Sequence, residues 1–167
     1  MKILHLLRHA KSAWDQPGLA DRQRGLNKRG KRDAPRMGAA LAAMIPPQSV
    51  AVSPANRAQL TLDGLCAGWP ALADLHHYTE EDLYTFDSRD LLEWIAAQDD
   101  RHGSLFLIGH NPGLTDLVNV VSGSWVLDNL PTAGYARLDL AIERWAALGE
   151  GVGTLACTLF PKQLTQE

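Results

Sequence analysis

The sequence is poor in cysteine, with only 2 among its 167 residues. Cys66 and Cys157 lie far apart, and neither belongs to a Cys-x-x-Cys pair. This spacing excludes a zinc knuckle and a thioredoxin-like redox motif, and it implies no disulfide framework. A chain of this length buries roughly 70% of the surface that it exposes when unfolded. We therefore expect a hydrophobic core, without covalent cross-links, to hold the fold together.

An excess of positive charge and long hydrophobic runs are also missing. The chain has 16 lysines and arginines against 19 aspartates and glutamates, a formal net charge of −3. Nucleic-acid-binding proteins usually carry a basic excess, so nucleic acid is not an expected partner. No run of apolar residues is long enough to span a membrane, and His5 interrupts the short apolar run at the N-terminus, which makes a poor signal peptide. We expect no membrane partner and a cytoplasmic location.

The sequence has no acidic cluster typical of a metal site, no Walker-type glycine loop, no internal repeat and no long linker. Its 46% hydrophobic and 21% charged residues are ordinary for a globular protein. We therefore expect one domain over residues 1–167.

Short apolar runs alternate with amphipathic segments along the first two thirds of the chain. Strands are expected at residues 3–7, 49–53, 75–78 and 105–108. Helices are expected at residues 26–45, 55–69, 88–98 and 114–122. This alternation predicts an α/β fold, a three-layer α/β/α sandwich around a mostly parallel sheet. Two later strand-like runs, at residues 136–142 and 154–160, predict an antiparallel edge.

The expected helix boundaries follow from capping residues and from proline. Asn27 and Ser88 are the expected N-caps of the first and third helices. Pro35 would clash with the carbonyl of Lys31 inside a helix. The regular part of the first helix is therefore expected to begin near Ala34, after an irregular turn.

Three segments that follow predicted strands carry cationic side chains. They are Arg8-His9-Ala10-Lys11-Ser12, Ser53-Pro54-Ala55-Asn56-Arg57-Ala58-Gln59 and Gly109-His110-Asn111-Pro112-Gly113. Each alone is compatible with an ordinary turn or helix boundary. Because parallel strands end at the same edge of a sheet, the three segments should meet where open α/β sheets bind ligands. Guanidinium groups suit phosphate, so we predict a phosphate site formed by Arg8, His9, Arg57 and His110, with Lys11 and Ser12 as further contacts.

These motifs resemble those of the histidine phosphatase superfamily, which has the phosphoglycerate-mutase-like fold. That superfamily carries Arg-His near the N-terminus, a second arginine after Ser-Pro and a second histidine late in the chain. Residues 6–14, 26–38, 109–113 and 160–162 are similar to the SixA-type phosphohistidine phosphatases. Two positions depart from the pattern. Ala10 replaces the usual glycine of the superfamily, and Gly25 replaces a proline that the subgroup often has.

The resemblance implies a covalent mechanism. His9 is the expected nucleophile and is transiently phosphorylated, while Arg8, Arg57 and His110 stabilise the transferring phosphoryl group. The two arginines should keep His9 neutral, because a neutral imidazole attacks phosphorus and an imidazolium does not. His110 is expected to help most as a cation. These cations supply the charge stabilisation, so no metal ion and no cofactor are expected.

The general acid stays open. Glu80 and Glu81 follow the strand expected at residues 75–78, but Thr79-Glu80-Glu81-Asp82 is also typical of the start of a helix. A phosphoimidazole leaving group depends less on such an acid, because water can protonate its nitrogen. A weak acid signal therefore favours phosphohistidine as the substrate.

The spacing of the motifs bears on the substrate. The segment between Arg57 and His110 has no insertion large enough for a deep lid, which predicts an open site suited to a side chain of another protein. We expect a protein phosphohistidine phosphatase with a histidine-phosphorylated protein as its partner. The alternatives are a phosphatase of small phosphomonoesters and a non-catalytic phosphate-binding adaptor domain.

Overall fold

A six-stranded sheet in the order β3-β2-β4-β1-β5-β6 organises the computed structural model, which describes residues 1–164. Its strands are β1 (Lys2–Arg8), β2 (Ala51–Val52), β3 (Tyr78–Thr79), β4 (Ser104–Gly109), β5 (Tyr135–Leu140) and β6 (Gly153–Leu159). The first four strands are mutually parallel. β5 runs antiparallel to β1, and β6 pairs antiparallel with β5 at the edge. The predicted mostly parallel sheet with an antiparallel edge is confirmed.

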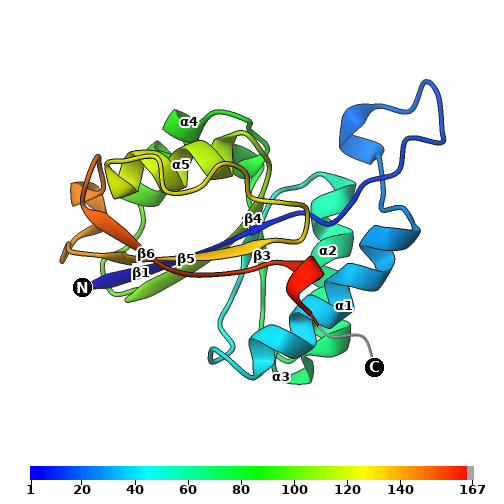
Figure 1. The fold of residues 1–167 in the computed structure, drawn as a ribbon, viewed down its shortest axis with the longest axis horizontal. Coiled ribbons are helices and arrows are strands. Elements are labelled where there is room, and N and C mark those ends of the chain that lie inside the picture. Colours follow the sequence, from blue (N-terminus) through cyan, green and yellow to red (C-terminus); the bar gives the residue numbers. More distant parts are fainter. Residues whose placement is uncertain (165–167) are drawn as a thin grey trace.

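Helices cover both faces of this sheet (Figure 1). α4 (Ser88–Ala96) and α5 (Gly113–Ser122) lie over one face, and α1 (Lys28–Ala42), α2 (Asn56–Gly68) and α3 (Pro70–Ala73) lie over the other. Short 3₁₀ turns occur at Asp21–Gln23, Glu81–Leu83, Trp145–Ala147 and Pro161–Gln163. The expected three-layer α/β/α sandwich is therefore confirmed. Within residues 1–164, no helix is long and apolar enough to cross a membrane.

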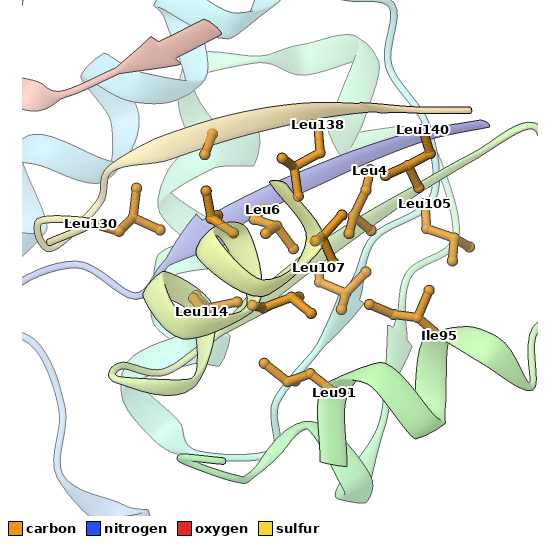
Figure 2. Close-up of a cluster of buried hydrophobic side chains, with 14 of the residues drawn as sticks. Leu4, Leu6, Leu91, Ile95, Leu105, Leu107, Leu114, Leu130, Leu138 and Leu140 are labelled. Atoms are coloured by element: carbon orange, nitrogen blue, oxygen red, sulfur yellow. The ribbon is translucent and has the colours of Figure 1, made fainter. Parts of the chain in front are cut away.

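The central strand β1 explains why two cores form. Its side chains alternate, so Leu4 and Leu6 join the core under α4 and α5 (Figure 2), whereas Leu7 joins the core under α1 and α2. All three leucines are fully buried. Each such burial contributes roughly 1.5–3 kcal/mol to folding. These contacts fix the strand that ends at Arg8.

The start of α1 differs from the prediction. The helix begins at Lys28 and is regular through Pro35, so the prediction of an irregular turn before Ala34 is wrong. The predicted N-cap is confirmed, because the Asn27 side chain accepts a hydrogen bond from the Gly30 N–H at 2.9 Å. α1 packs so closely on α2 that a Cβ on Gly38 would collide with the backbone of Leu65. This helix–helix contact outweighs the local cost of proline.

Other boundaries also moved. Asp87, and not Ser88, caps α4, because its carboxylate accepts from the Arg89 N–H at 2.9 Å. The strand expected at residues 75–78 begins only at Tyr78. The strand expected at residues 49–53 is reduced to Ala51 and Val52. β3 is the edge strand of the sheet, and β2 lies between β3 and β4.

Candidate functional site

The carboxyl ends of β1, β4 and β2 are adjacent and bring the three cationic segments together. The ladder continues beyond the strands, because the His9 N–H donates to Gly109 and the Ser53 N–H donates to Ile108, both at 3.1 Å. His9 and His110 have ring centroids 5.2 Å apart. Arg57 enters from the first turn of α2 and is 2% exposed. The four residues expected to bind phosphate therefore gather at one edge of the sheet.

The surroundings of His9 define which of its nitrogens is reactive. Its Nδ1 lies 2.8 Å from the carbonyl oxygen of Ala10. A carbonyl only accepts hydrogen bonds, so Nδ1 carries the proton and Nε2 keeps its lone pair. Burial lowers the pKa of His9 to about 4, and the charges of Arg57 and Arg8 act in the same direction. His9 is thus neutral near neutral pH, with Nε2 free to act as a nucleophile.

Three buried donors at the site lack a hydrogen-bond partner within residues 1–164. They are Nε of Arg8, Nε of Arg57 and Nδ1 of His110. Leaving a buried polar group unsatisfied costs about 1–3 kcal/mol, so several such groups at one place indicate a binding site. All three can donate, which makes the complementary ligand an anion with several acceptor oxygens.

His110 differs from the expectation of a cation. Burial, together with the neighbouring His9 and Arg57, lowers its pKa to about 3. Its Nε2 lies 2.7 Å from Oγ of Ser53, which is a neutral partner. The ring is therefore neutral near neutral pH, because it is 1% exposed and lies among positive charges that Asp21 offsets only in part.

Asp21 and its contact with Arg57 were missed by the sequence analysis. Nη1 of Arg57 donates to the Asp21 carbonyl oxygen at 2.8 Å, and Nη2 donates to Oδ2 of Asp21 at 3.0 Å. The same carboxylate accepts from Tyr84 at 2.5 Å. Partial burial opposes its ionised form, but the hydrogen bonds from Tyr84 and the arginines hold the pKa of Asp21 well below its ordinary value. Asp21 thereby orients Arg57 and leaves its Nε unpaired.

Arg24 was also missed as a site residue. It donates to Oδ1 of Asp21 at 2.7 Å and to Oγ of Ser12, and its guanidinium lies 3.7 Å from the centre of the Trp14 ring. The 3₁₀ turn at Asp21–Gln23 brings the side chains of Asp21 and Arg24 to the same side of the turn. The spacing Asp-x-x-Arg in the sequence could have indicated this contact. The contact between Asp21 and Arg57, which are 36 positions apart, has no such indication in the local sequence.

The two further phosphate contacts expected from the first motif fare differently. Ser12 is buried beside the site and already holds a hydrogen bond from Arg24. Lys11 is exposed, and its backbone carbonyl accepts from the Asn27 N–H at 3.0 Å. Only Ser12 is therefore tied to the network around Asp21, through Arg24.

Glu80 and Glu81, the candidates for the general acid, have surroundings that differ from those a general acid needs. Glu81 is exposed and accepts two hydrogen bonds from Arg22, at 3.0 and 2.7 Å. These bonds lower the pKa of Glu81, the opposite of what a general acid needs. Glu80 lines a separate cavity beside Trp94 and Phe106. In the described part of the chain, neither carboxylate is hydrogen-bonded to the two histidines, so this geometry does not favour the acid role.

An aromatic wall borders the site on the side of His110. The rings of Tyr84 and Phe86 have centroids 5.5 and 5.4 Å from that of His110. Phe86 is 48% exposed, so part of this wall faces solvent. The wall places an apolar surface beside His110, one of the three residues with a buried donor that lacks a partner in residues 1–164.

Comparison with known proteins places this geometry in a family. Residues 4–103 match the model of the histidine phosphatase superfamily, branch 1. An uncharacterized protein of Mycobacterium tuberculosis is 33% identical over 159 residues, which cover 89% of this chain and 96% of that protein.

Solved structures agree with this match. A protein of Agrobacterium tumefaciens assigned as the phosphohistidine phosphatase SixA aligns with a TM-score of 0.78 and 28% identity, covering 96% of this chain and 98% of that one. A structure of the protein histidine phosphatase SixA complexed with tungstate shares the fold, with a TM-score of 0.77 and 21% identity over 98% of this chain and 99% of that one. The phosphoglycerate-mutase-like fold is thus confirmed, and the chain belongs to the histidine phosphatase superfamily.

Proposed function

We propose that this protein removes phosphate from phosphohistidine on another protein, through a covalent intermediate on His9. One observation carries the proposal. The buried donors of Arg8, Arg57 and His110 that lack a partner in residues 1–164 gather beside the imidazole of His9, whose Nε2 has no proton. A pure phosphate-binding domain has no need of such a nucleophile, which argues against the adaptor alternative.

The reaction would proceed in two displacements. The Nε2 lone pair of His9 attacks phosphorus, and the P–N bond to the substrate imidazole breaks as the phosphoryl group passes to His9. A water molecule then attacks phosphorus, the new P–N bond breaks, and inorganic phosphate leaves. Phosphoryl transfer depends mainly on positioning and on charge stabilisation of the equatorial oxygens. Arg8, Arg57 and His110 would supply the donors for these oxygens.

The choice of phosphohistidine rests on the leaving group. Alcohol leaving groups need a positioned acid, and Glu81 is instead held ionised by Arg22 at the surface. An imidazole nitrogen accepts its proton from water. The similarity to SixA phosphohistidine phosphatases supports the same substrate class.

The test compares substrates on the purified protein. A carrier protein phosphorylated on histidine by a phosphoramidate reagent is offered beside a panel of sugar phosphates, and released phosphate is measured. We expect preferred turnover of the phosphohistidine protein and none with His9→Ala. His102→Ala is the matched control, because His102 is exposed and precedes β4, at the end of that strand opposite to the end that His110 follows. Faster turnover of a sugar phosphate would replace this proposal with the phosphomonoester alternative.

A further inference from the structure

Ser53 is a buried residue that the mechanism above does not use. It follows β2 directly and is 0% exposed. Its Oγ lies 2.7 Å from Nε2 of His110 and accepts a hydrogen bond from the Ala55 N–H at 3.2 Å. The hydroxyl therefore sits between a backbone donor and the imidazole of His110.

The position of its hydrogen follows from the available partners. A serine hydroxyl carries one hydrogen and needs an acceptor for it when buried. Ala55 contributes an N–H, which cannot accept. Across residues 1–164, the remaining hydrogen-bond partner of Ser53 Oγ is Nε2 of His110. The hydroxyl hydrogen therefore points to Nε2, which must hold a lone pair.

This arrangement determines the state of the other imidazole nitrogen. With Nε2 bare, the single proton of the neutral ring lies on Nδ1. Nδ1 of His110 is buried and has no partner in the described chain. The opposite tautomer would direct a lone pair, which repels phosphate oxygens, into the same space.

We propose that Ser53 is a positioning residue that keeps His110 in its Nδ1–H tautomer, so that Nδ1 donates a hydrogen bond to the phosphoryl group in transfer. The second half of this statement rests on the proposed phosphatase function, whereas the tautomer itself does not. His110 then acts as a neutral donor, and no proton leaves it during the reaction.

The two histidines of the site thus have complementary roles set by different partners. The Ala10 carbonyl takes the Nδ1 proton of His9 and leaves Nε2 as the nucleophile. The Ser53 hydroxyl occupies Nε2 of His110 and leaves Nδ1–H as the donor. Both rings hold the same tautomer, but each leaves a different nitrogen without a protein partner.

The first test needs no substrate. In protein labelled with ¹⁵N-histidine near neutral pH, the His110 resonances should show a protonated Nδ1 and a bare Nε2. Ser53→Ala should convert this signal to a mixture of the two tautomers, while Ser122→Ala should not. Ser122 is the matched control because its Oγ is buried without a partner in residues 1–164 and lies at the far end of α5. A proton on Nε2 in the wild type would overturn the proposal.

The second test uses a double-mutant cycle with the phosphohistidine protein. Ser53→Ala should lower kcat by about 5- to 10-fold with little change in KM, the loss expected from one neutral hydrogen bond in the transition state. In the His110→Ala background, Ser53→Ala should cause no further loss, because Ser53 acts through His110. Ser53→Thr, which keeps a hydroxyl, should retain more activity than Ser53→Ala, and circular dichroism would verify folding of each variant.

The two tests separate the possible failures. Equal losses from Ser53→Ala with and without His110 would mean a merely structural role and would overturn the positioning proposal. A wild type that turns over no phosphohistidine would instead reject the proposed function, and the tautomer would still be decided by the ¹⁵N measurement.

Discussion

Acid is expected to weaken this fold through His9, whose imidazole is buried at the strand ends. An unfolded histidine titrates at about pH 6.5. Burial lowers the pKa of His9 to about 4 in the folded protein, against a smaller opposing effect of the Ala10 carbonyl. Between these values the unfolded chain binds more protons than the folded one. The contribution to stability is therefore complete above about pH 6.5 and is lost as the pH falls toward 4.

The magnitude follows from the size of the shift. Each pKa unit corresponds to about 1.4 kcal/mol, and at about pH 5 the unfolded histidine is almost fully protonated while the folded one is not. His9 alone should then lower the free energy of unfolding by about 2 kcal/mol relative to about pH 7.5. His110, whose pKa is about 3, should cause a comparable loss. A typical domain has a total stability of about 5–15 kcal/mol, so the loss is easily measured.

Urea unfolding at about pH 7.5 and about pH 5 measures this difference directly. In His9→Gln, the decrease in the free energy of unfolding between the two pH values should be smaller than in the wild type by about 2 kcal/mol. His102→Gln, at an exposed histidine, should behave like the wild type. Equal decreases in the wild type and in His9→Gln would refute the reasoning, because they would mean that His9 titrates normally in the folded protein.

Four further predictions concern the chemistry. Arg57→Ala should lower turnover by on the order of 10²–10³, measured as phosphate release, because it removes an oxyanion donor; near-normal rates would mean that Arg57 does not contact the phosphate. Wild type quenched during turnover should carry an acid-labile, alkali-stable phosphate that peptide mapping places on His9. A phosphate found on His110 or Ser12 would mean that this residue, and not His9, is the nucleophile. Activity should survive exhaustive chelation, since Arg8 and Arg57 supply the positive charge at the site; a strict need for added magnesium would contradict this. Glu81→Gln should change phosphohistidine turnover less than about two-fold, because it alters an exposed pair with Arg22; a large loss would restore Glu81 as the acid.

Some features could not be read from local sequence because distant contacts decide them. Pro35 predicted a late start for α1, yet close packing against α2 keeps the helix regular from Lys28. The link between Asp21 and Arg57 joins positions 36 residues apart, and no pattern along the chain indicates it. Local rules describe neighbours in sequence, whereas these contacts depend on which elements pack together.

The sequence by itself determined the class of fold and which residues gather at the candidate site. Alternating apolar runs place Leu4 and Leu6 in the core on one side of β1, and the motifs after the strands place His9 and His110 at one edge. The protonation states were left to the tertiary structure. Burial among positive charges makes His110 neutral, where the sequence suggested a cation, and the Ser53 hydroxyl meets its ring across the sheet edge. A pKa and a tautomer depend on dielectric and on partners in space, so the folded arrangement alone decides them.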